Sequence, residues 1–543
     1  MNQFSKKHLV GLAAMSGLLL AASFPPVPTG ITAFLGLVPF LFLMENMRST
    51  WQAFRYSYLT FLVFNIFTIY WVTGFDMGKD PWLFAAGVAV ILVHPLLFTL
   101  PGVLFYRVFR HLGQVVALAA FPFIWTAYEW LAQVPSLSFP WLVLANSQTY
   151  DIDRIQFIQY TGAFGASFWI VGVNVLVYVL IVKMGLKHWD LRTPKFYVVA
   201  VALVLSVLLP AVHGRYVLNQ KSYHATIKVG IIQPNIDPYE KWSSEPGSRM
   251  KLLRTLLDSY ESLGKRKDLG LILLPETAIP FYILEQAYFP QKQLLQETVN
   301  RVGVPLLTGF ADLQYFNEDE APAGARKLPG DSGLRYESYN SSMLVLPFSP
   351  QVQVYHKMKL TPMSERVPFI DIFPFLADAL SWGVGISNWG VGKDTTVFTL
   401  PGKEYVQPIR TWAMICYETL YPEFVAQFVK RGAHVLAVIT NDGWFGKTSG
   451  PYQLQRYTVL RAIENRRAIA RCANNGISCF IDPFGRVSQA TELYTKTTLV
   501  GKLPLLRETT LYTRWGDWFA RLCAFVTALL IITMFIYRKK TRR

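Results

Sequence analysis

The sequence predicts an α-helical membrane bundle joined to a water-soluble α/β domain, and two observations support this fold class. The 543-residue chain is 52% hydrophobic and 15% aromatic, with a mean hydropathy of +0.28, which is more apolar than a soluble chain of this length needs. The apolar residues also gather into runs of about 20 residues, the length of a helix that spans a bilayer. These runs lie near both ends of the chain, and none lies between residues 214 and 516.

Eight apolar runs predict eight membrane spans. They cover residues 9–24, 31–44, 56–75, 82–106, 115–134, 163–183, 196–213 and 517–537. The predicted organisation is a seven-span bundle over 1–213, a soluble domain over 214–516, and an eighth span with a basic tail over 517–543. The first run also has the basic start and small residues of a cleaved signal peptide, but we expect it to remain as a span.

The net charge of +17 is distributed unevenly between the two sides of the predicted membrane. The loops on one side hold two basic residues, Lys79 and Arg154. Those on the other side, with the two termini, hold fifteen: Lys6, Lys7, Arg48, Arg55, Arg107, Arg110, Lys183, Lys187, Arg192, Lys195, Arg538, Lys539, Lys540, Arg542 and Arg543. Because Lys and Arg concentrate in cytoplasmic loops, we expect a protein of the bacterial inner membrane with cytoplasmic termini and a periplasmic 214–516 domain. This distribution also argues against a nucleic-acid-binding surface.

The soluble domain alternates strand and helix patterns. β-branched apolar runs predict strands at 227–236, 269–276, 304–313, 341–348, 351–360, 410–418, 433–442 and 475–487. Amphipathic patterns between them predict helices at 248–265, 290–303, 422–432 and 450–469. Such alternation predicts a layered α/β domain.

Two segments of this domain depart from the pattern. Residues 314–338 are charged and rich in Gly and Pro, which predicts an exposed insertion. Residues 367–390 are rich in Phe, Trp and Leu. They either pack in the ordinary way or form a loop that enters the outer leaflet or covers a lipid-facing entrance.

The four cysteines have no spacing typical of a metal site, so we expect no metal. A disulfide between Cys472 and Cys479 is compatible with an oxidising compartment, although nothing in the sequence requires it.

One cysteine, Cys416, lies in the stretch "AMICYETLYPEF", where an apolar strand ends and a turn and helix follow. Backbone N–H groups at a helix start favour a thiolate and can donate to an oxyanion. A lone cysteine after an apolar strand is nevertheless more often a core residue. This stretch alone leaves both interpretations open.

Two other positions favour the nucleophile. Glu276 ends one predicted strand, and Lys357 lies near the end of another and is followed by Glu365. A cysteine nucleophile needs a base to accept its proton and a cation or donor to stabilise an oxyanion. A glutamate at a turn or a lysine on a hairpin is, taken alone, typical of an exposed surface. The prediction of a nucleophilic Cys416 therefore depends on Glu276, Lys357 and Cys416 occurring together.

The motifs "PETAIP", "YHKMKLTPMSE", "ICYE", "TNDGWFG" and "RAIENRR" occur in this order. Together they resemble the nitrilase (carbon–nitrogen hydrolase) superfamily. With apolar spans on both sides of the domain, the whole chain resembles the membrane-embedded apolipoprotein N-acyltransferase branch. The sequence reads "LTPMSE" where "LVPFGE" is commoner, and Lys359 and Leu454 also depart from the family pattern, which affects local packing and lipid preference more than the chemistry.

This resemblance implies an αββα sandwich and a set of site residues. Glu276 would be the general base, Lys357 the oxyanion-stabilising cation and Cys416 the nucleophile. Glu365 would orient or polarise the site. The residues that would shape the site are Tyr417, Glu418 and Trp242.

The resemblance also implies a reaction: transfer of an acyl chain from a membrane phospholipid, through a Cys416 thioester, to the α-amine of a diacylglyceryl apolipoprotein. The implied partners are these two lipid substrates and the bilayer, without a cofactor or nucleic acid, and we expect a monomer. Two other functions stay open at this point. One is a membrane-bound nitrilase-like amidase, because water attacks the same thioester. The other is a transporter-like bundle with a nitrilase-like binding module.

Overall fold

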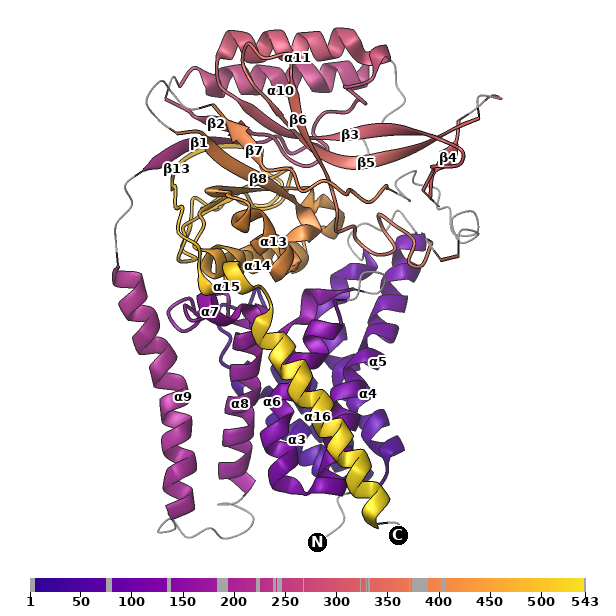
Figure 1. Ribbon diagram of the computed structural model, residues 1–543, viewed down its shortest axis with the longest axis vertical. Helices are drawn as coiled ribbons and strands as arrows, with labels where there is room; N and C mark the ends of the chain where they lie inside the picture. Colours follow the sequence, from indigo (N-terminus) through magenta and orange to yellow (C-terminus); the bar gives the residue numbers. More distant parts are fainter. Residues whose placement is uncertain are drawn as a thin grey trace.

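The computed structural model describes residues 5–74, 81–133, 138–182, 194–220, 225–237, 241, 247–266, 268–322, 324–328, 330, 333–370, 372–373, 389–401 and 407–541. Figure 1 shows two parts, a group of long upright helices and an α/β part above them, with both termini at the far end of the helices. The last helix, α16, returns from the α/β part to the helical part, so the two parts are connected by the chain on both sides.

Each predicted apolar run forms helix. The helices are α1 (Lys6–Ala21), α2 (Ala33–Gly36), α3 (Val38–Glu45), α4 (Thr50–Ile69), α5 (Pro81–Leu112), α6 (Gln114–Leu131), α8 (Ala163–Leu180), α9 (Pro194–Asn219) and α16 (Trp518–Thr541). Helix α9 runs past the expected domain boundary at residue 213.

Five described stretches are long and apolar enough to cross a membrane: Thr50–Thr73, Phe84–Leu112, Ala163–Leu180, Pro194–Asn219 and Trp518–Tyr537. The runs that form α1, α2–α3 and α6 are not among these five. Eight spans therefore stay a prediction.

The α/β part contains two sheets. The first has the order β13-β1-β2-β3-β5-β4, with β6 paired to β5, and the second has the order β12-β11-β10-β9-β8-β7. The strands of the first sheet are β1 (Thr226–Gln233), β2 (Leu271–Leu273), β3 (Leu306–Asn317), β4 (Arg326–Lys327), β5 (Leu334–Val345), β6 (Val352–His356) and β13 (Thr497–Pro504). Those of the second are β7 (Phe398–Leu400), β8 (Ile409–Ile415), β9 (Val435–Thr440), β10 (Ile469–Ala473), β11 (Cys479–Ile481) and β12 (Val487–Ser488).

The centre of each sheet is parallel, and its strands are buried on both faces. Strand β2 pairs in parallel with β1 and β3, and β9 pairs in parallel with β8 and β10. Every residue of β2, β9 and β10 is buried, which explains the nearly continuous apolar sequences of β2 and β9. The sheets lie face to face, since the Cys472 sulfur on β10 is 3.4 Å from the Ile232 oxygen on β1.

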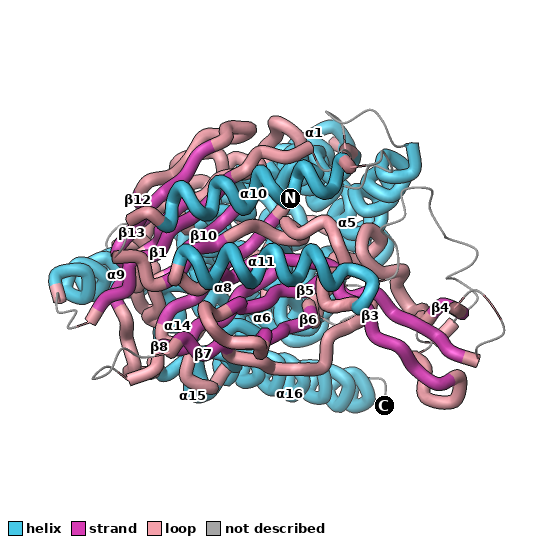
Figure 2. The backbone as a smooth tube through the Cα atoms, turned by 90° about the horizontal axis from the view of Figure 1, so that it is seen from above, coloured by secondary structure: helices cyan, strands magenta, loops and turns pink. Residues whose placement is uncertain are grey.

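Helices cover both outer faces of the two sheets. Helices α10 (Ser248–Gly264) and α11 (Phe289–Val302) lie side by side across the first sheet (Figures 1 and 2). Helices α13 (Pro422–Lys430) and α14 (Gly450–Asn465) lie between the second sheet and the long apolar helices (Figure 1). The four layers confirm the expected αββα sandwich.

Two expectations about the sheets were wrong in detail. The segment 314–338 is not a simple insertion, because β3 and β5 continue through its ends as a long hairpin from Leu306↔Val345 to Asn317↔Leu334. The strand expected at 475–487 is divided into β11 and β12 by a turn at Gly485. Strands β4, β7, β10 and β13 were not predicted. Cys472 and Cys479 are free thiols, and most of the 367–390 segment lies outside the described residues.

Candidate active site

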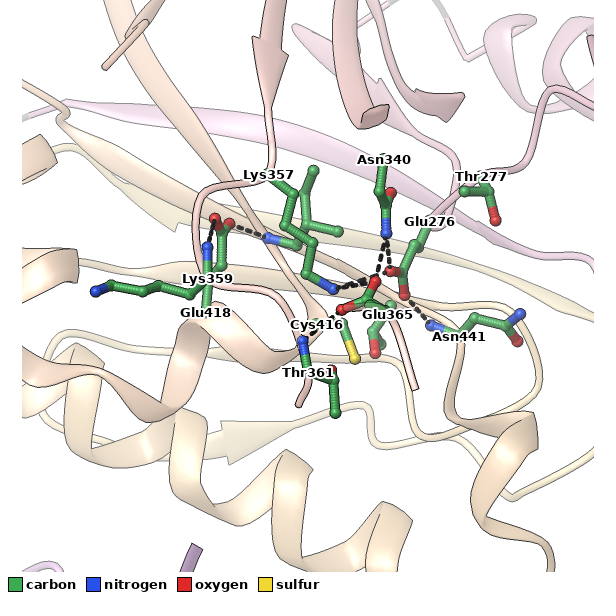
Figure 3. A network of polar contacts seen from close by, with 12 residues as sticks. Glu276, Thr277, Asn340, Lys357, Lys359, Thr361, Glu365, Cys416, Glu418 and Asn441 are labelled. Carbon is green, nitrogen blue, oxygen red and sulfur yellow. Dashed lines mark hydrogen bonds and ion pairs between the residues drawn. The ribbon is translucent and has the colours of Figure 1, made fainter. Parts of the chain in front are cut away.

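The three residues of the predicted triad follow the ends of three strands and meet at one place. Glu276 follows β2, Lys357 follows β6 and Cys416 follows β8, so both sheets contribute. In Figure 3 their side chains point toward one another, with Glu365 between them. The structure therefore brings together Glu276, Cys416 and the Lys357–Glu365 pair, which come from three distant parts of the sequence.

A tight turn holds Glu276 at the end of β2. The next residue, Thr277, has a φ of +45°, in the left-handed region. Gly309 on β3 allows this turn, because a Cβ there would lie 2.7 Å from the Glu276 Cα. The Glu276 carboxylate accepts hydrogen bonds from the Asn340 side chain at 2.7 Å and from the Asn441 backbone N–H at 2.9 Å.

Lys357 is almost fully buried and forms ion pairs with two carboxylates. Its Nζ lies 2.9 Å from Glu365 Oε1 and 3.4 Å from Glu276 Oε1. Burial alone would lower the pKa of this lysine, but the two carboxylates outweigh burial and raise the pKa above its usual range. Burial alone would raise the pKa of Glu365, but the Lys357 ammonium outweighs the effect of burial and lowers that pKa. The two carboxylates thus favour the charged form of Lys357 in the site.

Cys416 lies at a sharp turn with a φ of +50°, at the start of a short 3-10 helix over Cys416–Leu420. Burial and the Glu276 carboxylate raise the pKa of the thiol, and Lys357 only partly opposes them. The expectation that the helix start favours a thiolate was therefore wrong. The physical reason is that burial and the neighbouring Glu276 carboxylate both disfavour a charged sulfur. Both effects favour the protonated thiol, and attack by a protonated thiol needs a base to accept the proton.

Glu418 connects the loops that carry Cys416 and Lys357. Its Oε1 accepts hydrogen bonds from the Tyr355 hydroxyl at 2.5 Å and the Met358 N–H at 2.8 Å, and its Oε2 accepts one from the Ile415 N–H at 2.8 Å. Burial raises the pKa of Glu418 to about 7. This carboxylate positions the two loops, and in Figure 3 it lies apart from the Glu276–Glu365 pair.

Tyr417 connects the same turn to the helical part of the molecule. Its hydroxyl donates to the Ser138 carbonyl at 3.0 Å, and its ring stacks on Trp141 with centroids 6.4 Å apart. Trp242, the last residue predicted to shape the site, lies outside the described residues.

Sequence reasoning missed two residues of the site. The Asn340 side chain donates to both Glu276 at 2.7 Å and Glu365 at 3.0 Å. Lys241 is buried and donates to the Glu276 carbonyl at 3.1 Å, and burial lowers its pKa to about 7. Neither has a signal in a single sequence, because an Asn in a strand and a Lys in a polar segment are typical of exposed positions.

Within the described ranges, no group of three or more His, Cys, Asp or Glu residues is arranged to hold a metal ion. The arrangement instead suits acyl chemistry: a protonated thiol, a carboxylate that can accept its proton and a buried cation.

Two family models match the chain. The apolipoprotein N-acyltransferase N-terminal domain matches residues 16–176, and the carbon-nitrogen hydrolase domain matches residues 228–510. The apolipoprotein N-acyltransferase of Chlorobaculum tepidum is 36% identical over 97% of this chain and 97% of its own length. That of Geobacter metallireducens is 30% identical over 98% and 95%.

Solved structures also match about half of the chain. The structure of Saccharomyces cerevisiae Nit3, a member of branch 10 of the nitrilase superfamily, covers 52% of this chain and 92% of its own, with 16% identity and a TM-score of 0.36. The matches of family models and full-length relatives decide the assignment: the chain belongs to the apolipoprotein N-acyltransferase family, with a carbon–nitrogen hydrolase domain as its α/β part.

Proposed function

We propose that this protein transfers an acyl chain from a membrane phospholipid to the α-amino group of the N-terminal S-diacylglyceryl-cysteine of apolipoproteins. The observation that carries the proposal is the cluster of Glu276, Lys357 and Cys416 on a domain joined to apolar helices. The names of the full-length relatives support the same reaction.

In the first half-reaction, the Cys416 sulfur attacks an ester carbonyl of the phospholipid while Glu276 accepts the thiol proton. The Lys357 ammonium stabilises the oxyanion that forms. When the tetrahedral intermediate collapses, the C–O bond breaks and Glu276 returns the proton to the leaving alcohol. The products are a lysophospholipid and a thioester on Cys416.

In the second half-reaction, the α-amine of the diacylglyceryl-cysteine attacks the thioester carbonyl. Glu276 accepts a proton from the amine, the C–S bond breaks, and Glu276 returns the proton to the Cys416 sulfur. An amide forms on the apolipoprotein and the enzyme regains its starting state. Two substrates that use one covalent intermediate in turn give ping-pong kinetics.

We further propose that the protein is a monomer of the bacterial inner membrane, with cytoplasmic termini and the site on the periplasmic side. Both substrates are lipids, and moving an acyl chain into water costs ~0.8 kcal/mol per CH₂. A site beside the helix ends avoids this cost. Tyr417 and Trp141 connect the Cys416 turn to those helices, which supports this placement.

Intact mass tests the proposal. Full-length protein incubated with a phosphatidylethanolamine of defined chains should gain the mass of one acyl group, which hydroxylamine removes. The variant Cys416→Ala should gain no mass, whereas Cys523→Ala, which removes a thiol of α16, should gain it normally. An adduct that persists in Cys416→Ala contradicts the proposal.

A further inference from the structure

Thr440, the last residue of β9, lies beside the nucleophile. Strands β8 and β9 pair in parallel, with Ile415 opposite Ile439. The next residues along the two strands are Cys416 and Thr440, which therefore leave the sheet side by side. Thr440 is fully buried, and its side chain forms a hydrogen bond with the Cys416 sulfur. The hydroxyl thus contacts the atom that reacts.

The residue after Thr440 contacts the base. The Asn441 backbone N–H donates to Glu276 Oε2 at 2.9 Å (Figure 3). Two consecutive residues at the end of β9 therefore contact the two groups between which the proposed proton transfer takes place.

The Thr440 hydroxyl also has a second partner. It donates to Asp442 Oδ1 at 2.7 Å, and the Arg471 guanidinium forms an ion pair with Asp442 Oδ2 at 2.8 Å. Each of these three residues is at most 2% exposed. A buried carboxylate beside a guanidinium is a strong acceptor, so Asp442 holds the hydroxyl proton while Cys416 is a thiol.

A hydroxyl has one proton, so Thr440 donates to one of its two neighbours at a time. A protonated Cys416 needs no donor, because its S–H can donate to the hydroxyl oxygen. A thiolate carries a full negative charge and no proton, which makes the sulfur a strong acceptor. Rotation about the C–O bond is enough to turn the hydroxyl proton from Asp442 to the sulfur.

The groups around the Cys416 sulfur have opposite effects on its charge. Burial and the Glu276 carboxylate raise the pKa of the thiol, and so does Asp442. Lys357 and the Thr440 hydroxyl lower it. Lys357 is paired with two carboxylates and is also the proposed stabiliser of the oxyanion. A neutral donor at the sulfur therefore adds stabilisation that Lys357 does not supply.

We propose that Thr440 is a further catalytic residue, whose hydroxyl turns from Asp442 to the Cys416 sulfur as Glu276 takes the thiol proton. No bond within Thr440 breaks, because the proton passes from the sulfur to Glu276 and the hydroxyl changes only its acceptor. When the C–S bond of the thioester later breaks, the departing sulfur accepts the same hydrogen bond until Glu276 returns the proton. Asp442 and Arg471 are positioning residues, because they hold the hydroxyl in place between reactions.

Alkylation of Cys416 by iodoacetamide tests this role. The full chain is treated at pH 8 in detergent free of phospholipid, and peptide mapping follows the Cys416 adduct. Thr440→Val removes the hydroxyl at nearly constant volume and should slow alkylation by about threefold or more, since the thiolate loses a hydrogen bond. Thr440→Ala should slow it likewise. Thr440→Ser keeps a hydroxyl and should restore the rate to within about twofold.

Two further variants distinguish a donor to the sulfur from a structural role. Thr411→Val makes the same change at another buried threonine, on β8, and should leave the rate unchanged. Asp442→Asn removes a negative charge and the competing acceptor, so it should speed alkylation. Melting temperatures are measured for every variant, and rates are compared among those that stay folded.

The proposal would be overturned if folded Thr440→Val or Thr440→Ala reacted as fast as the unmodified chain. It would also be overturned if Thr440→Ser were as slow as they are. The role of Thr440 in catalysis rests on the proposed acyl transfer, but alkylation needs no lipid, so the two failures are distinguishable. A missing acyl adduct on the unmodified chain contradicts the transfer, and an unchanged alkylation rate contradicts the role of Thr440.

Discussion

Asn340 is the neutral residue that holds two carboxylates beside one lysine. Its side-chain nitrogen donates to Glu276 and to Glu365, and its backbone carbonyl accepts a hydrogen bond from the Lys357 N–H at 2.8 Å. A single amide therefore orients both carboxylates toward the same ammonium group. This residue, rather than a further charged one, keeps the cluster at one net negative charge.

The variant Asn340→Asp should shift the pH profile of acyl transfer. A third carboxylate beside Glu276 disfavours the charged form of this base by like-charge repulsion. The base should then stay protonated to higher pH, so the acid limb of kcat/KM should move to higher pH. The measurement is kcat/KM against pH, with Asn317→Asp on the exposed end of β3 as control. A lower rate with an unmoved acid limb would assign Asn340 a purely structural role.

Glu276 should affect the reactivity of Cys416 in two opposite ways. Its charge raises the pKa of the thiol, so Glu276→Gln should lower that pKa and speed alkylation by iodoacetamide at pH 8. The same change removes the proposed base, and acyl transfer should fall by ~10²–10⁴-fold. Alkylation rates from intact mass, measured beside transfer rates, check both effects. If alkylation slowed together with transfer, the conclusion that the Glu276 charge raises the pKa of the Cys416 thiol would be contradicted.

At the scale of elements, the ends of the strands bring the site residues together, and the turns that follow orient their side chains. Most strands and helices were predictable, because buried parallel strands are continuously apolar and α10 and α11 are amphipathic. Strand β10 was missed because its sequence "IARCA" contains a buried arginine, Arg471, which forms an ion pair with Asp442 at 2.8 Å. Strand β13 was missed because its partner β1 lies more than 250 residues earlier in the chain, and pairing at that distance leaves no local pattern.

Gly309 shows how one element constrains another. Gly309→Ala should lower the melting temperature, because the added methyl group overpacks the Glu276 turn and overpacking costs ~1–3 kcal/mol. Acyl-transfer activity should fall by more than the loss of folded protein accounts for, since the turn that is displaced carries Glu276. Gly172→Ala on α8 is the matched control, because a Cβ there meets no heavy atom within 4 Å. Equal melting temperatures for the two variants would refute the close approach of β3 to this turn.

At the scale of the whole molecule, the helical part and the α/β domain are joined by specific polar contacts. Gln453 binds four groups from the helical part, and the Glu464 carboxylate accepts a hydrogen bond from the Ala163 N–H at 2.7 Å. The apolar runs could be identified from sequence, as could Glu276, Lys357 and Cys416, which the structure brings together. This junction could not, because it depends on backbone carbonyls and indoles that meet only in the folded chain.

Gln453→Leu should loosen this junction. It leaves two indole N–H groups and two carbonyls without partners, and each unsatisfied buried group costs ~1–3 kcal/mol. The melting temperature should fall, and transfer should fall with it, since Trp141 packs against Tyr417 beside Cys416. The control is Gln455→Leu, which loses only a 3.5 Å contact to the Cys479 sulfur. A Gln453→Leu protein as stable as this control would show that the Gln453 contacts are unimportant for the junction.

The central claim is that a Cys416 thioester passes its acyl group to an amine in preference to water. The direct measurement is a chase of the isolated acyl-enzyme in nanodiscs with a diacylglyceryl-cysteine peptide, an N-acetylated form of that peptide, or buffer alone. The account predicts rapid discharge by the free-amine peptide with the acyl group on its α-nitrogen, and slow discharge in the other two arms. Discharge in buffer as fast as with the free-amine peptide would contradict it and identify the protein as a membrane-bound hydrolase.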